Sequence, residues 1–180
     1  MKRYSLCLIG FLPLAMNCMA ADAPTAPAST ATTQTQQPQQ PAARGPALAL
    51  ALEAAQKALE TCKGLDQKVA VSVLDSASVQ RVLLASDGAL PRGVQSSDTK
   101  AITALAFNAP SFKVADLAKT NPDLAAKLAA NPNFNTHAGG LLLKVGDQVI
   151  GAIGVGGAHG SEKDEACAQA GLDQIQARLQ

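Results

Sequence analysis

GGLLLKVGDQVIGAIGVGGAHGSEKDEACAQAGLDQI, residues 139–175, decides the fold of this chain. Its first half holds two apolar runs rich in β-branched residues, 141–145 and 149–155. Gly146 and Asp147 follow the first run, and a pair of this kind is typical of the two-residue turn of a tight β-hairpin. The stretch therefore predicts a strand, a turn and a second strand.

The second half of the stretch is a glycine-rich turn followed by a helical pattern. Ser161 and Asp164 have the spacing of a capping box, which predicts a helix beginning there. A glycine turn before a helix also suits a dinucleotide phosphate. That interpretation fails on spacing, because after Gly154 and Gly156 the third glycine of the fingerprint would fall on His159. A close-packed turn and a ligand-lining loop both stay open.

The same residues resemble the C-terminal signature of the GlcG/HbpS family, also called the haem-degrading domain family. Its members carry a Gly-Gly strand, a GAIGVSGA-like turn and a D-E-x-C/I-A-x-A-G helix, and residues 139–173 follow that order. Gly156 stands where many relatives have Ser, as in a Cys-containing branch of the family. LASDGALPRG, residues 84–93, is similar to another family segment. The resemblance covers roughly residues 48–179 and implies a profilin-like fold with a five-stranded antiparallel sheet.

The N-terminus predicts export. Residues 1–21 combine a basic start, an apolar run too short to span a membrane, and small residues at the end, which is the pattern of a signal peptide. Cys18 would suit lipoprotein processing instead, but Asn17 departs from the small residue preferred before such a cysteine. We therefore expect the mature protein in the periplasm or secreted from the cell.

A low-complexity segment separates the signal peptide from the domain. Residues 22–45 consist mainly of Ala, Thr, Gln and Pro, with no large apolar side chain, and such a composition predicts a disordered tether. Residues 46–180 then form one domain, for which the 47% apolar content of the chain supplies a core. The formal net charge of +1, without a basic run, gives no footprint for nucleic acid or an anionic membrane surface.

Periodicity predicts an α+β domain with an antiparallel sheet and helices packed on it, in the order α-β-β-α-α-β-β-α. The middle helical region splits into two or three helices, and a fifth strand near 133–137 is not visible in the sequence. The expected elements are a helix from Pro46 to about Lys63, strands 68–75 and 79–85, a helix over 97–109 capped by Ser96 or Ser97, short helices 111–119 and 122–130, a loop over 131–138, and the C-terminal hairpin and helix. On the first helix the spacing predicts one buried stripe, Leu48, Leu52, Ala55, Leu59 and Cys62.

Few residues can carry chemistry. The sequence holds no HExxH, no CxxC and no defensible Ser-His-Asp order, so whether the protein is an enzyme stays open. His137 and His159 are the only imidazoles, and they flank the C-terminal hairpin. Because antiparallel strands return to the same edge, we expect the two at one end of the sheet, either as metal ligands or as ordinary exposed loop histidines.

The family resemblance implies haem. Relatives are described as haem binders that assemble as oligomers, some linked to haem degradation, and Lys100–Ala104 matches the family's Lys-Ala-x-Thr-Ala segment. Thr103, His137, His159 and Lys100 are accordingly the expected haem-binding residues, with Thr103 alternatively bonding its own helix backbone. The resemblance thus predicts an exported, homo-oligomeric haem carrier, sensor or degradation protein. An interaction module and a non-haem small-molecule enzyme are the alternatives.

A disulfide is expected between Cys62 and Cys167. They are the two cysteines that remain after signal-peptide removal, and export brings them into an oxidising compartment. Each occupies an apolar stripe of a terminal helix, so the pairing requires these two helices to lie side by side and antiparallel. Two buried free thiols are the alternative.

Overall fold

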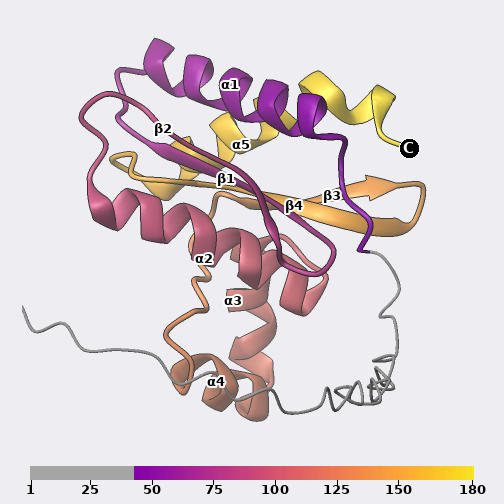
Figure 1. The fold of residues 1–180 in the computed structure, drawn as a ribbon. Helices are drawn as coiled ribbons and strands as arrows, with labels where there is room; N and C mark the ends of the chain where they lie inside the picture. The colour runs from indigo at the N-terminus through magenta and orange to yellow at the C-terminus, as the bar shows by residue number, and fades with distance from the viewer. Residues whose placement is uncertain (1–42) are drawn as a thin grey trace, which may run out of the picture. The chain divides into compact units, whose positions relative to one another are not determined.

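The computed structural model describes residues 43–180 (Figure 1). The predicted signal peptide and all but the last residues of the predicted tether lie outside this range. Five α-helices and four strands follow one another in the described part of the chain. They are α1 (Leu48–Gly64), β1 (Ala70–Asp75), β2 (Gln80–Ala85), α2 (Pro91–Phe107), α3 (Ser111–Thr120), α4 (Pro122–Ala129), β3 (Gly140–Val145), β4 (Gln148–Gly156) and α5 (Ser161–Ile175), with a 3₁₀ turn at Gln176–Arg178.

The strands form one antiparallel sheet in the order β2-β1-β4-β3. Both predicted hairpins are confirmed. In the C-terminal hairpin Val145 pairs with Gln148, and Gly146 takes the positive φ of 57° that the two-residue turn requires. The described residues contain four strands and not the five that the family resemblance implied, because residues 133–137 are irregular.

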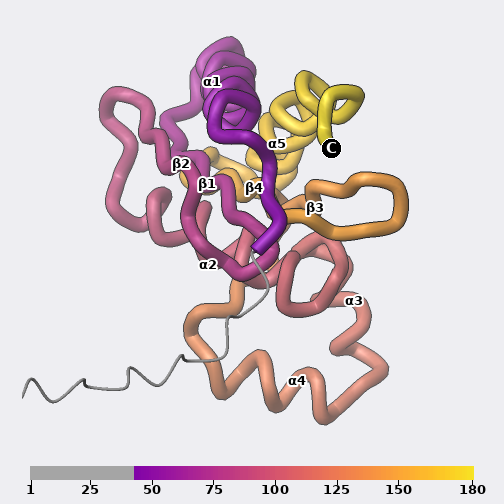
Figure 2. The backbone as a smooth tube through the Cα atoms, turned by 45° about the vertical axis from the view of Figure 1, so that its right-hand side comes forward, coloured from indigo at the N-terminus to yellow at the C-terminus, as the bar shows by residue number. Residues whose placement is uncertain are grey.

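Helices cover both faces of the sheet. In Figures 1 and 2, α1 and α5 lie on one face and α2 on the other, with α3 and α4 beyond α2. The larger core lies under α1 and α5, where the side chains of Val71, Val73 and Ile153 are buried. A smaller core, including Leu74 and Ala152, lies under α2. The α+β architecture expected from the sequence is confirmed.

The buried face of α1 differs from the predicted stripe. Leu48 and Leu52 are 59% and 39% exposed, whereas Ala54 and Ala58 are fully buried beside Ala55 and Cys62. The reason is the close approach of α1 to α5. A Cβ at Gly171 of α5 would lie only 3.2 Å from the Ala58 Cβ atom, so small residues must face this contact and the leucines turn outward.

This contact contains the predicted disulfide. Cys62 in the last turn of α1 is bonded to Cys167 near the start of α5, with their Cα atoms 5.5 Å apart. The end of one helix therefore meets the beginning of the other, as the pairing required, and the disulfide joins the two helices on the same face of the sheet.

Helix α2 begins six residues earlier than predicted. Pro91 occupies its first turn, where a missing N–H costs no hydrogen bond, and Leu90 precedes it. Ser97, which was expected to cap the helix, is buried in its interior. Its Oγ donates to the Val94 carbonyl 2.8 Å away and lies 2.9 Å from the Ser72 Oγ of β1. The serine thus joins α2 to the sheet, a role that its local sequence does not reveal.

Helix α2 lies directly on β4 because glycines leave room for it. A Cβ at Gly156 would lie 2.6 Å from the Ser97 nitrogen and 2.7 Å from the Gly93 oxygen, so any side chain there would push the helix away. Close packing therefore accounts for this glycine of the C-terminal turn.

The domain starts slightly before Pro46. Arg44 N donates to the Ser76 Oγ over 2.9 Å, and Ser76 N donates to the Arg44 carbonyl over 2.8 Å. Residues 44 and 45, assigned to the tether from the sequence, thus contact the turn between β1 and β2. Among residues 43–180, none of the helices is both long enough and apolar enough to cross a membrane.

Candidate functional site

Two neighbouring cavities lie along the first half of α2. One, of about 240 Å³, is also lined by the turn after β4 and the start of α5. The other, of about 430 Å³, lies between α2 and the loop over 131–138. Arg92, Ser96 and His137 line both cavities, so together they form one groove, which we call the α2 groove.

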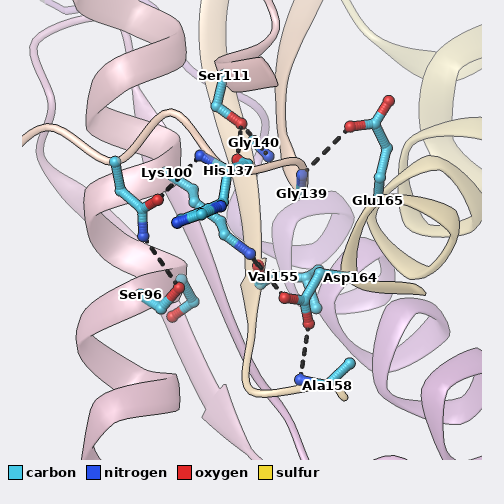
Figure 3. A network of polar contacts seen from close by, with 12 residues as sticks. Ser96, Lys100, Ser111, His137, Gly139, Gly140, Val155, Ala158, Asp164 and Glu165 are labelled. Atoms are coloured by element: carbon cyan, nitrogen blue, oxygen red, sulfur yellow. Dashed lines mark hydrogen bonds and ion pairs between the residues drawn. The ribbon is translucent and has the colours of Figure 1, made fainter. Parts of the chain in front are cut away.

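The smaller cavity has a buried ion pair on its wall. Lys100 Nζ of α2 lies 2.6 Å from the Asp164 Oδ2 of α5 and donates to the Val155 carbonyl of β4 over 3.0 Å (Figure 3). The other carboxylate oxygen of Asp164 accepts the Ala158 N–H over 3.0 Å. The lysine is 2% exposed and the aspartate 3%. The pair therefore connects α2, β4 and α5 at one point beside the groove.

Gly139 makes this arrangement possible. Its φ of 120° disfavours any side chain, and a Cβ there would lie 3.1 Å from Lys100 Nζ and 2.9 Å from the Asp164 Cβ. The Gly-Gly sequence that opens β3 is thus needed for the Lys100–Asp164 contact, in addition to starting the strand.

Burial shifts the pKa values of three ionisable side chains in this region. Burial lowers the pKa of Lys100, against the attraction of Asp164, which works to raise it. Burial likewise raises the pKa of Asp164, against the effect of the Lys100 ammonium. Burial thus opposes the charged form of each group, while the attraction between the two groups favours it. Burial also raises the pKa of Glu165, although its Oε2 accepts the Gly139 N–H over 3.3 Å.

Hydrogen bonds fix the loop that carries His137. The Thr103 Oγ1 accepts the Asn135 N–H over 2.7 Å and donates to the Thr99 carbonyl over 2.7 Å. Ser111 Oγ donates to the His137 carbonyl over 2.6 Å and accepts the Gly140 N–H (Figure 3). The loop backbone is therefore held against α2 and α3, and this holds His137 beside the groove.

The structure brings together some of the residues predicted as a site and not others. As expected, His137 and His159 lie at the same end of the sheet, since His137 precedes β3 and His159 follows β4. At this end Val155 N donates to the Gly139 carbonyl. Only His137 lines the groove, beside Lys100. His159 lines neither cavity, and its backbone N–H donates to the Gln67 Oε1 atom. Thr103 is fully buried and lines neither cavity.

Sequence reasoning missed several residues of the groove. Asp164 was interpreted as a helix-capping residue, but Gly160 is the N-cap and makes no side-chain cap, and the aspartate pairs with Lys100 instead. No local pattern shows an ion pair between residues 64 positions apart. Arg92 and Ser161 were also missed. Gly157, from the glycine turn, lines the smaller cavity.

The groove lacks an ordinary metal cluster. Across residues 43–180, no three His, Cys, Asp or Glu side chains come together in a way that could hold a metal ion.

Comparisons with known proteins give the same fold. A crystal structure of HbpS shares 30% identity at a TM-score of 0.66 and covers 77% of this chain and 93% of its own. A crystal structure of a double mutant of Streptomyces reticuli HbpS shares 30% identity at a TM-score of 0.66, and the match covers 86% of this chain and 97% of that one. The crystal structure of the PduOC:Heme complex is 22% identical at a TM-score of 0.67, and the match covers 74% of this chain and 96% of that one. A search of curated proteins gave no match.

The family profile agrees with these structures. The profile described as "Haem degrading protein HbpS-like" matches residues 47–173, which include all five helices and all four strands apart from the last residues of α5. The match is therefore to the whole folded domain. The chain belongs to the HbpS-like family of haem-degrading proteins.

Proposed function

We propose that this protein is exported and binds haem in the α2 groove, with His137 as the iron ligand. The observation that carries the proposal is the position of His137, which lines both cavities of the groove. A neutral imidazole is a usual axial ligand of haem iron. No methionine or tyrosine lies within residues 43–180 to compete for this role.

Other residues of the groove suit the rest of a haem molecule. The Arg92 guanidinium can pair with a propionate in a bidentate geometry. Phe134 and Pro132 can contact the ring in the larger cavity, whose lining is otherwise mainly polar. With one protein ligand and a groove open to solvent, binding is loose and exchangeable, as a carrier or sensor needs.

The comparisons support this proposal in outline. The family is described by haem degradation, and the similar PduOC protein has been crystallised with haem. We propose no iron contact for Thr103, whose hydroxyl already makes two hydrogen bonds, or for His159, which lies outside the groove. Localisation in the periplasm or outside the cell is also a proposal. The Cys62–Cys167 disulfide supports it, because such bonds persist in oxidising compartments.

Haem titration of the purified domain tests the proposal. The wild type should develop a Soret band, and His137→Ala should weaken binding at least about tenfold, or about 1.4 kcal/mol. His159→Ala is the matched control, because it removes an exposed imidazole at the same end of the sheet, and it should bind like the wild type. Equal affinities of the wild type and His137→Ala would refute the ligand assignment.

The same titration separates binding from degradation. Adding a reductant under air to the loaded protein should leave the Soret band in place for a carrier or sensor. Steady loss of the band with release of iron would instead show haem breakdown.

A further inference from the structure

Lys100 lines the smaller cavity, where its amine can react with a bound molecule. An ammonium group has three N–H donors, and the structure gives Nζ two acceptors, the Asp164 carboxylate and the Val155 carbonyl. Lys100 nevertheless lines the cavity. Gly139 presents no side chain beside Nζ, where a Cβ would lie 3.1 Å away. Within residues 43–180, this nitrogen has no third hydrogen-bond acceptor.

Stability alone gives little reason to bury such a pair. A buried ion pair often contributes no more stability than apolar side chains of similar volume would. Lysines whose amines are desolvated beside a proton acceptor occur as nucleophiles, because the neutral amine attacks carbonyl carbon. Burial lowers the pKa of Lys100 and raises that of Asp164, which is the direction that this chemistry requires.

We propose that Lys100 forms an imine with a small 2-oxo carboxylic acid bound in the 240 Å³ cavity. Nothing in the haem proposal assigns this reaction, and it does not depend on haem. The volume admits a molecule of a few carbon atoms. Arg92, on the same cavity wall, offers a guanidinium for the carboxylate, while the keto carbon faces Lys100. Ser96 and Ser161 add hydroxyl groups to the lining.

The reaction balances without an oxidant or reductant. The Lys100 ammonium passes a proton to Asp164, which lies 2.6 Å away. The amine lone pair forms the N–C bond while the carbonyl π electrons move to oxygen, which takes the proton from Asp164. The nitrogen then gives a second proton to Asp164, which protonates the hydroxyl. The C–O bond breaks, water leaves, and a protonated C=N bond remains.

Reductive trapping tests this proposal on the wild-type protein. The domain is incubated at pH 7 with pyruvate and cyanoborohydride, and the modified lysines are mapped by peptide mass spectrometry. Because a lowered pKa leaves more of the amine neutral at pH 7, Lys100 should be labelled faster than Lys119. Lys119 is the internal control, because its side chain is 74% exposed. Equal or slower labelling of Lys100 would overturn the proposal.

Variants separate the parts of the proposal. Lys100→Met should lose the fast adduct, and Lys119→Arg should keep it. Arg92→Gln should slow labelling by pyruvate several-fold more than it slows labelling by acetaldehyde, because only pyruvate has a carboxylate. Equal effects on both probes would refute the carboxylate contact. Should Lys100→Met not fold, the wild-type labelling ratio still decides. Labelling uses no haem, so its failure leaves the haem titration untouched.

Discussion

At the scale of single residues, the Lys100–Asp164 pair is the feature that local sequence could not reveal. Both residues belong to recognisable helices, but their pairing depends on how α2 and α5 meet over β4. Gly139 gives a partial signal, since a Gly-Gly opening of a strand indicates close approach of another group. The identity of that group becomes visible only in three dimensions.

Removing one partner of this pair should be costly. In Asp164→Asn the Lys100 amine loses its carboxylate while staying buried, and such losses typically cost about 3–5 kcal/mol. The matched control is Asp116→Asn, which breaks the exposed Lys119–Asp116 pair and should cost less than about 1 kcal/mol. Urea unfolding of the three proteins measures both effects. Equal losses for the two variants would show that burial of the Lys100–Asp164 pair has no energetic consequence.

Glu165 should give the protein a specific pH dependence. Burial raises its pKa in the folded state above the unfolded value, so its contribution to stability is complete below about pH 4.3 and is lost as pH rises through the folded pKa. Glu165→Gln stays neutral and keeps an acceptor for the Gly139 N–H. The melting temperature of this variant, relative to wild type, should therefore be higher at pH 7 than at pH 4. A difference that is the same at both pH values would contradict the raised pKa.

At the scale of elements, prediction from the sequence succeeded where the signal is local. The two-residue turn, the two hairpins and the short helices α3 and α4 have their own turn residues and periodicity. The start of α2 and the buried face of α1 were wrong, since packing against β4 and α5 decides them. At α1 the period-3.6 pattern was present, but small residues and not leucines face the neighbouring helix.

The disulfide belongs to this scale, since it joins two helices. Mass analysis of the non-reduced protein should show Cys62 and Cys167 resistant to alkylation until a reductant is added. Replacing both with Ala should cost about 2–5 kcal/mol in urea unfolding, because the bond closes a long loop. Free alkylation of both cysteines in the non-reduced protein would contradict the pairing.

At the scale of the whole molecule, we expect self-association. Leu48 and Leu52 are exposed one turn apart on the outer side of α1, and clustered apolar surface of this kind is a feature of contacts between proteins. Light scattering should give a mass that is a multiple of the monomer mass. Leu48→Gln with Leu52→Gln should reduce that mass if α1 takes part. A monomer at every concentration would refute the prediction.

The sequence could predict only part of the candidate site, and the reason is physical. All four predicted residues were expected to bind haem. His137 and Lys100 line the same cavity, whereas His159 and Thr103 do not line it. Strand topology correctly placed both histidines at one end of the sheet. It could not show which of them faces the groove, because that depends on the hydrogen bonds that hold the loop over 131–138.

A crystal structure of the protein with haem bound tests the proposed haem site most directly. We predict the macrocycle in the α2 groove, with the iron bonded to His137 and a propionate near Arg92. The Lys100–Asp164 pair should remain intact beside it. Haem on any other face of the domain, or iron held by a residue outside the groove, would contradict the account.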